Sequence, residues 1–276
     1  MSFSHAIVRP PSATFADGLT TAGLGAPELA LAREQHEAYV RALEACGLAV
    51  TRLPADDRFP DSTFVEDTAV LARGLAVLCR PGAPSRAGEV EAIRSAVEAA
   101  FADVAAIVEP GTVDGGDVCE AGEHVFIGVS ERTNEAGARQ LAAHLATRGL
   151  SSSLVDVRGI PGLLHLKSGI AWLGGRTLAL SVPFAERPEF AGWDVLRVPD
   201  REEYAANAVL VNGRVLVAAG FPRFEAAVRA LGLPTVPLDM SEFRKLDGGL
   251  SCLSLRFGAT AQGSNRHGVN RHGVRS

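Results

Sequence analysis

A repeated hairpin signal constrains the fold of this chain more than any other feature of its sequence. Four segments consist of an apolar run, a turn containing glycine and a second apolar run, and they lie at residues 68–78, 118–127, 169–180 and 208–217. Such a turn between two apolar runs is a strong hairpin signal, because glycine accepts the left-handed backbone of tight turns. The turn glycines recur about every 40 to 50 residues, a period that predicts an internal structural repeat.

Helical periodicity follows three of the four hairpins. Apolar residues are spaced three or four apart along 89–101 and 134–147, and along the shorter segment 224–231, as on the buried face of a helix. Each of these segments leads to a short apolar strand. The third hairpin is followed by a weaker insert, 183–193, before its own strand. The repeated unit is therefore strand, strand, helix, strand.

The two ends of the chain can supply a fifth unit. A strand at 5–9, a helix at 28–46 and a strand at 49–53 follow one another near the N-terminus, and 250–257 would add the missing strand. Pairing the two ends would close the ring and remove exposed sheet edges. We therefore predict the α/β class, with five ββαβ units in one closed α/β-propeller domain over residues 1–257. A two-domain α/β protein with unrelated hairpins is the alternative.

Charge and cysteine usage narrow the class of protein. The net charge of −5 argues against a nucleic-acid surface. No apolar run approaches the ~20 residues of a membrane helix, and the N-terminus lacks a secretory signal. The four cysteines are widely spaced, without CxxC pairs or zinc-ligand spacing: Cys46, Cys79, Cys119 and Cys252. We expect reduced thiols in a cytoplasmic protein, with no cofactor and no metal.

The segment 258–276 differs from the rest of the chain. It is polar, rich in glycine and poor in apolar residues, and a short Arg-His-Gly unit recurs in it. Such a composition predicts a disordered tail. His267 and His272 could bind a metal, but a solvated tail is the favoured interpretation.

Polar side chains precede the first strand of every predicted hairpin. They lie at 61–67, 114–117, 165–168, Asn207 and 247–252. Each has a plain local explanation, since a DGG sequence is a turn and a free cysteine is most often a small buried residue. In a closed ring, however, matching positions of the repeat converge near the axis. Five such positions therefore predict a functional site there.

Four of these segments carry a family resemblance. They are FVED at 64–67, TVDGGD at 112–117, LHLK at 164–167 and KLDGGLSC at 245–252. Together and in this order they resemble the dimethylarginine dimethylaminohydrolases, which belong to the guanidino-group-modifying superfamily with the five-bladed pentein fold. The resemblance covers about residues 4–257. It implies a hydrolase of linear amidines that converts Nω-methylated arginines to citrulline and methylamine or dimethylamine, without a cofactor.

The resemblance implies three catalytic residues, which are Cys252, His165 and Asp114. A thiolate is a strong nucleophile, and at Cys252 it would attack the guanidinium carbon and form a covalent S-alkylthiouronium intermediate. His165 would protonate the departing amine and then activate water. We expect Asp114 to orient His165.

The resemblance also implies residues that bind the substrate. Carboxylates match the fork of guanidinium N–H groups, and this role falls to Asp61, Glu66, Asp67 and Asp114. The α-carboxylate would meet Arg86 and Arg132, and the α-ammonium group would meet backbone carbonyls at Leu19 and Leu246. Leu19 lies in the glycine-rich loop 17–25, which we interpret as a mobile lid. We interpret Gly248 and Gly249 as clearance for the substrate beside the sulfur.

Two other functions stay open at this point. A deiminase acting on arginine or another guanidine would share the chemistry and release ammonia, although arginine deiminases typically carry an inserted helical domain for which this chain has no room. A catalytically idle protein that binds arginine-like ligands is the second alternative. In each case we expect a small-molecule ligand, no nucleic acid and no membrane as partners, and we allow for a homodimer.

Overall fold

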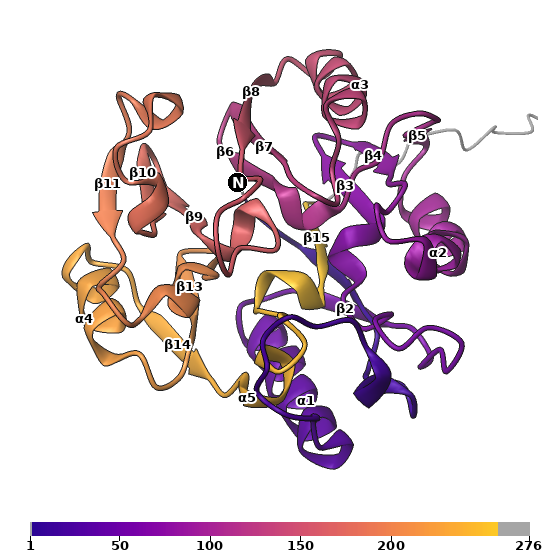
Figure 1. Cartoon of the computed structure of the whole chain (residues 1–276), viewed down its shortest axis with the longest axis horizontal. Coiled ribbons are helices and arrows are strands. Elements are labelled where there is room, and N and C mark those ends of the chain that lie inside the picture. The colour runs from indigo at the N-terminus through magenta and orange to yellow at the C-terminus, as the bar shows by residue number, and fades with distance from the viewer. Residues whose placement is uncertain (1, 259–276) are drawn as a thin grey trace, which may run out of the picture.

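Five three-stranded sheets stand around a common axis in the computed structural model, which describes residues 2–258 (Figure 1). The prediction of a disordered tail lies outside these residues. In sequence order the sheets, or blades, are β3 (Ala69–Ala72), β4 (Leu75–Leu78) and β5 (Asp103–Ala106); β6 (Val118–Ala121), β7 (His124–Val129) and β8 (Ser151–Asp156); β9 (Ile170–Gly174), β10 (Thr177–Leu180) and β11 (Asp194–Arg197); β12 (Val209–Val211), β13 (Arg214–Ala218) and β14 (Thr235–Leu238); and β15 (Leu255–Phe257), β1 (His5–Val8) and β2 (Ala49–Arg52).

Every blade has the same strand directions. The first strand pairs with the second in antiparallel fashion, and the second pairs with the third in parallel fashion. The fifth blade joins the two ends of the chain, because β15 pairs antiparallel with β1, with Ile7 opposite Leu255. The predicted ring of five units, closed by its terminal strands, is therefore confirmed. Ring closure leaves no blade without a neighbour on either side (Figure 1).

The hairpin turns carry the conformations that their glycines predict. Arg73 and Gly74 have φ angles of 47° and 78°, and Asn212 and Gly213 have φ angles of 47° and 82°. Two successive residues with positive φ are typical of the type I′ turn, whose twist matches that of the flanking strands. Asparagine is one of the few residues besides glycine that accept this backbone.

Helices cover the outside of four blades. They are α1 (Leu29–Ala45), α2 (Ala87–Ala100), α3 (Glu135–Ala146) and α4 (Pro222–Ala230), with a short α5 (Ser241–Arg244). Their periodic apolar residues are buried against the sheets, as with Ile93 and Val97 of α2. The third blade has two 3-10 turns, Val182–Phe184 and Pro188–Phe190, where the others have a helix. None of the described helices is both long and apolar enough to cross a membrane.

A short 3-10 turn precedes the first strand of every blade. These turns span Val65–Thr68, Gly115–Asp117, Leu166–Ser168, Glu203–Ala206 and Ser251–Leu253. The predicted strand at 250–257 is therefore correct only for its second half, because its first half forms this turn. Neighbouring turns lie in contact around the axis, so the polar positions of the repeat do converge.

Candidate active site

A small cavity at one end of the axis collects most of the predicted site residues. We call it the front cavity, and it is lined by Leu19, Asp61, Phe64, Asp67, Arg86, Arg132, Leu164, His165, Leu246, Asp247, Gly248 and Cys252. Of the predicted site residues, only Glu66 and Asp114 do not line it. The site is thus assembled from segments that lie far apart in the sequence, each held by the 3-10 turn of its own blade or by a loop beside it.

Cys252 lies in the 3-10 turn before β15 and is partly exposed in the front cavity. Burial and the nearby carboxylates of Glu66 and Asp67 raise the pKa of its thiol to about 12. Before a ligand binds, the sulfur is therefore protonated at neutral pH. The positive charge of a cationic ligand beside the sulfur would offset the negative charges of both carboxylates. It would thereby lower the pKa of the thiol and favour the thiolate.

His165 lines the front cavity together with Cys252 and is held by an aspartate. Its Nε2 lies 3.0 Å from Oδ2 of Asp114, which is fully buried behind the ring. Burial alone would lower the pKa of His165, but the carboxylates of Asp67, Asp114 and Asp117 outweigh it and raise the pKa to about 9. At neutral pH the ring is an imidazolium, which is the form that can give a proton to a leaving group.

The TVDGGD segment makes room for this ring. A Cβ atom on Gly116 would lie 2.6 Å from Nδ1 of His165 and 2.9 Å from Oδ1 of Asp67. Its backbone N–H donates a hydrogen bond to the same Asp67 oxygen, at 2.8 Å. Glycine at position 116 therefore allows His165 and Asp67 to approach one backbone segment from the cavity side.

Asp67 and Asp61 are the carboxylates that line the front cavity. Burial would raise the pKa of Asp67, but His165 and Arg86 overcome this effect and lower the pKa to about 2. Burial raises the pKa of Asp61, which accepts a hydrogen bond from the backbone N–H of Leu19 at 3.1 Å. A guanidinium entering the cavity would thus find one firmly ionised carboxylate, Asp67, and a second whose ionisation the cation itself would favour.

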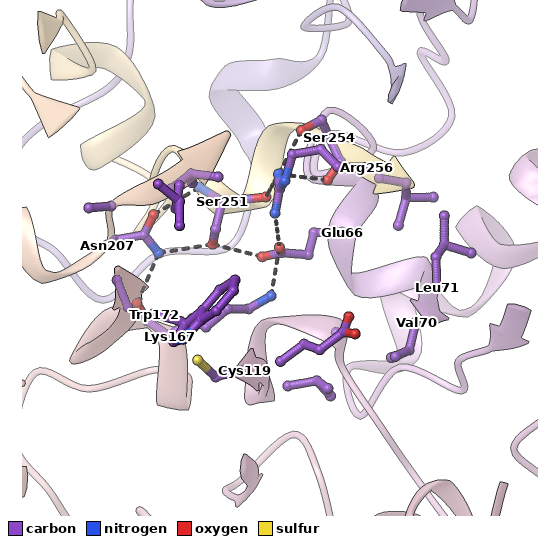
Figure 2. A pocket seen from close by; sticks show the side chains of 18 of the residues that line it. Glu66, Val70, Leu71, Cys119, Lys167, Trp172, Asn207, Ser251, Ser254 and Arg256 are labelled. Carbon is purple, nitrogen blue, oxygen red and sulfur yellow. Dashed lines mark hydrogen bonds and ion pairs between the residues drawn. The ribbon is translucent and has the colours of Figure 1, made fainter. Parts of the chain in front are cut away.

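Glu66 points to the opposite end of the axis from Asp67, its neighbour in the chain. Its carboxylate lies 2.6 Å from Nζ of Lys167 and 3.3 Å from Nη2 of Arg256, and it accepts a hydrogen bond from Oγ of Ser251 at 2.8 Å. These residues line a second cavity of about 140 Å³, the rear cavity, in which Glu66 stands at the centre (Figure 2). The structure thus separates Glu66 from the carboxylates with which the sequence grouped it. The separation arises because consecutive side chains of a tight 3-10 turn point in different directions.

Arg86 and Arg132 both line the front cavity but differ in their existing partners. Arg86 is buried and donates hydrogen bonds to Asp67 and to both oxygens of Glu89. The side chain of Arg132 is 18% exposed, and its nearest carboxylate oxygen is on Asp114, at 3.9 Å. Arg132 is therefore the cation more available to an incoming carboxylate.

The loop 17–25 is bonded to the segment that precedes Cys252. Oγ1 of Thr20 donates to the carbonyl of Lys245 at 2.7 Å, and the backbone N–H of Thr21 donates to Oδ2 of Asp247 at 2.6 Å. Leu19 is 40% exposed and lines the front cavity. The loop is therefore held beside the cavity by a few exposed hydrogen bonds, and its opening as a lid stays a prediction.

The two glycines ahead of Cys252 correct one interpretation. A Cβ atom on Gly248 would lie 2.3 Å from the ring of Phe64, and one on Gly249 would lie 2.6 Å from the side chain of Asn207. Protein side chains, not empty space for a ligand, occupy the room that these glycines leave. Both residues are therefore needed for packing of the turn, and the interpretation as substrate clearance is wrong.

One cluster of the described residues has the composition of a metal site. Ligand atoms of Asp67, Asp114 and His165 all lie within 4.8 Å of one another. Asp67 is already paired with Arg86, and Asp114 with His165. A cation bound here would have to compete with both pairs, so the donor set is better suited to holding a proton than a metal.

Several residues of the site had no assigned role in the sequence. Lys167 is part of the LHLK motif, and Asn207 occupies the matching position of the fourth unit, so both carried a signal. Asp247, which holds the loop, lies within the KLDGGLSC motif and so also carried a signal. Glu89 and Arg256, which hold Arg86 and Glu66, carried none: Glu89 follows Arg86 by three residues as an ordinary helical acid, and Arg256 meets a residue far away in the chain.

Comparisons with known proteins place this geometry in context. A family model described as arginine deiminase matches residues 58–161. The chain is 46% identical over 256 residues to N(G),N(G)-dimethylarginine dimethylaminohydrolase of Pseudomonas aeruginosa, covering 92% of this chain and 100% of that protein. It is 39% identical over 258 residues to the protein of the same name from Streptomyces coelicolor, covering 93% of this chain and 98% of that protein. A solved structure of the Pseudomonas aeruginosa protein, a cysteine-to-serine mutant complexed with citrulline, matches with a TM-score of 0.90 at 45% identity over 93% of this chain and 100% of that chain.

Proposed function

Because this chain belongs to the dimethylarginine dimethylaminohydrolase family, we propose that it hydrolyses asymmetric dimethylarginine and monomethylarginine to citrulline and the corresponding amine. The observation that carries the proposal is the convergence of Cys252, His165 and Asp67 on one cavity, with His165 bonded to Asp114. This set provides a nucleophile, an acid and a carboxylate for a guanidinium group. The chain is therefore a hydrolase of carbon–nitrogen bonds in linear amidines.

The substrate lies with its guanidinium group between Cys252 and the carboxylates of Asp67 and Asp61. Paired oxygens match the planar fork of guanidinium donors. Arg132 takes the α-carboxylate, with Arg86 beside it, and the carbonyls of Leu19 and Leu246 receive the α-ammonium group. The front cavity has a volume of only about 20 Å³, room for one or two water molecules, so entry of the substrate requires the loop 17–25 to open.

The first half of the reaction forms a covalent intermediate. The bound cation favours the thiolate of Cys252, whose proton leaves to solvent, and the sulfur attacks the guanidinium carbon. His165, charged in the empty enzyme, gives its proton to the methylated nitrogen, and the carbon–nitrogen bond breaks. Dimethylamine or methylamine leaves as the neutral amine and takes up a proton from solvent, which balances the proton that Cys252 released, and the S-alkylthiouronium intermediate stays on Cys252.

The second half of the reaction returns the enzyme to its starting state. His165 is now neutral and takes a proton from a water molecule that attacks the same carbon. The carbon–sulfur bond breaks, the hydroxyl proton of the adduct passes to the departing sulfur of Cys252, and citrulline forms. Asp114 holds the ring in place through both halves and stabilises its charged form. The sum is one methylated arginine cation and one water converted to citrulline and one ammonium cation of the released amine.

A substrate panel tests the proposal. Purified protein is incubated under reducing conditions with asymmetric dimethylarginine, monomethylarginine, symmetric dimethylarginine and arginine, and citrulline and the released amine are measured separately. We expect citrulline with equimolar dimethylamine or methylamine from the first two. Citrulline from arginine with release of ammonia, at a higher kcat/KM, would instead identify a deiminase. No citrulline from any of the four would contradict the proposal.

The cellular setting belongs to the same proposal. All four cysteines are free thiols, which supports a cytoplasmic enzyme whose nucleophile must stay reduced. A homodimer stays a prediction, and the molar mass measured by light scattering at micromolar concentration would decide it.

A further inference from the structure

We propose that Asn207 is a positioning residue, which sets the distance between the nucleophile and the acid of the reaction. It lies on the fourth blade, which gives no side chain to the front cavity, at the end of the 3-10 turn Glu203–Ala206. Its side chain connects the turn that carries Cys252 to the turn that follows His165. The inference rests on the proposed function, because it assigns Asn207 a part in that reaction.

Asn207 makes two hydrogen bonds to the turn that carries Cys252. Oδ1 of Asn207 accepts a hydrogen bond from the backbone N–H of Ser251 at 2.9 Å, and its Nδ2 donates to Oγ of Ser251 at 3.0 Å. Ser251 immediately precedes Cys252. Both groups of the amide therefore hold the peptide from which the nucleophile projects, and Asn207 itself is buried.

The same amide holds the turn of the acid. Nδ2 of Asn207 also donates to the backbone carbonyl of Lys167 at 3.0 Å, two residues after His165 and within the turn Leu166–Ser168. Cys252 and His165 project from blades that are not neighbours in the ring. Asn207, on the blade between them, bonds to backbone groups of both turns, the N–H of Ser251 and the carbonyl of Lys167.

Glu66 closes these contacts into a ring of four residues, in which Lys167 takes part through both its backbone carbonyl and its Nζ. Oγ of Ser251 accepts from Asn207 and donates to Glu66, and Nζ of Lys167 pairs with the other Glu66 oxygen (Figure 2). Each hydroxyl and amide donor in the ring has an acceptor, so the direction of every hydrogen bond is fixed. A buried network whose hydroxyl and amide donors are all paired holds one geometry.

Packing at Gly249 restrains Asn207 further. A Cβ atom at position 249 would lie 2.6 Å from both Cγ and Oδ1 of Asn207. The backbone of the nucleophile's turn therefore lies directly against the amide. A displacement of either one would move the other, and errors of about 1 Å at reacting atoms cost on the order of a hundredfold in rate.

The test compares two asparagines with matched contacts. Asn212 also makes three hydrogen bonds, donating to the carbonyls of Phe3 and Cys46 and accepting from the backbone N–H of Phe3, but it lies in an exposed hairpin turn. Asn207→Ala removes one amide, and Asn212→Gly removes the other while keeping the positive φ of 47° acceptable. Steady-state kinetics with asymmetric dimethylarginine and thermal unfolding are measured for both.

We expect Asn207→Ala to lower kcat about ten- to a hundredfold with KM changed less than threefold, and Asn212→Gly to leave both constants unchanged although it also destabilises the fold. Gly249→Ala, which displaces the amide without removing it, should lower kcat in the same way. Folded Asn207→Ala with kcat within twofold of the wild type, or with a raised KM and unchanged kcat, would overturn the inference. An inactive wild type would instead count against the proposed function.

Discussion

The two ends of the propeller axis contain similar residues and have different chemistry. The front cavity holds a cysteine, a carboxylate and a cation in Cys252, Asp67 and His165, and the rear cavity holds Cys119, Glu66 and Lys167. Burial raises the pKa of both thiols to about 12. A lowered thiol pKa therefore does not distinguish Cys252, the proposed nucleophile, from the buried Cys119.

The two cavities differ in the bonding partners of their charged side chains. At the rear, Glu66 is bonded to Lys167, Arg256 and Ser251, and these contacts hold the blades together. At the front, the imidazolium of His165 can transfer its proton, and Asp67 and Asp61 face the cavity. Adjacent residues are divided between the two ends, Glu66 and Ser251 to the rear and Asp67 and Cys252 to the front. One set of turns therefore supplies both the reactive groups and the network that supports them.

The largest difference between the two ends is expected at the cysteines. Cys252→Ser should lower kcat by at least about a thousandfold with the fold intact, because serine at this position is a far weaker nucleophile than a thiolate. Cys119→Ser should keep kcat within about threefold of the wild type. Citrulline formation and circular dichroism measure both. Equal losses in the two variants would erase the distinction between front and rear.

The second-largest difference in activity is expected between variants of the neighbouring carboxylates, Asp67 and Glu66. Asp67→Asn should lower kcat/KM about a hundred- to a thousandfold, since it removes the ionised group that binds the guanidinium and helps charge His165. Glu66→Gln should leave KM nearly unchanged and lower kcat about tenfold through the turn of Cys252, with a larger loss of unfolding free energy. Steady-state kinetics with chemical denaturation separate the two effects. A raised KM in Glu66→Gln would mean that Glu66 does reach the substrate.

A substitution of Arg132 tests how the α-carboxylate of the substrate is bound. Arg132→Met should raise KM about ten- to a hundredfold with kcat changed less than threefold, because a charge-assisted hydrogen bond to the α-carboxylate contributes about 1.5–3 kcal/mol in both ground and transition states. Arg139→Met, on the exposed surface of α3, is the matched control and should change neither constant. A substrate analogue lacking the α-carboxylate should show little further loss in Arg132→Met.

The smallest expected effect is on stability and comes from Glu120, a carboxyl group of the rear cavity that takes no part in turnover. Burial raises the pKa of Glu120 in the rear cavity to about 7. The folded state therefore binds more protons than the unfolded chain between about pH 4.5 and 7, and the carboxyl lowers stability as the pH rises through this window. Glu120→Gln should remove this loss, on the order of 1 kcal/mol at pH 8 after solvent screening, without changing kcat. Denaturation of both proteins at pH 5 and pH 8 checks it, and an equal difference at the two pH values would refute it.

The repeat could be predicted from the sequence because glycine turns and helical periodicity are local signals. The strand-strand-helix-strand unit, ring closure by the two ends of the chain and convergence of the polar turns were all predicted from it. The placement of Glu66 and Asp67 in different cavities was not predicted. The direction of each side chain depends on the 3-10 turns at 65–68 and 251–253, and no local sequence pattern there indicates such a turn. The packing role of Gly248 and Gly249 was likewise hidden, since Phe64 and Asn207 come from distant segments.

The most direct test of the account is the identity of the residue that carries the covalent intermediate. Wild-type enzyme is mixed with asymmetric dimethylarginine, quenched in acid at a series of times from milliseconds onward, digested and mapped by mass spectrometry. We predict an S-alkylthiouronium adduct on the peptide that contains Cys252, formed and lost at rates consistent with turnover, and none on Cys119. An adduct on Cys119, or turnover with Cys252 unmodified at every time, would contradict the assignment of the chemistry to the front of the ring.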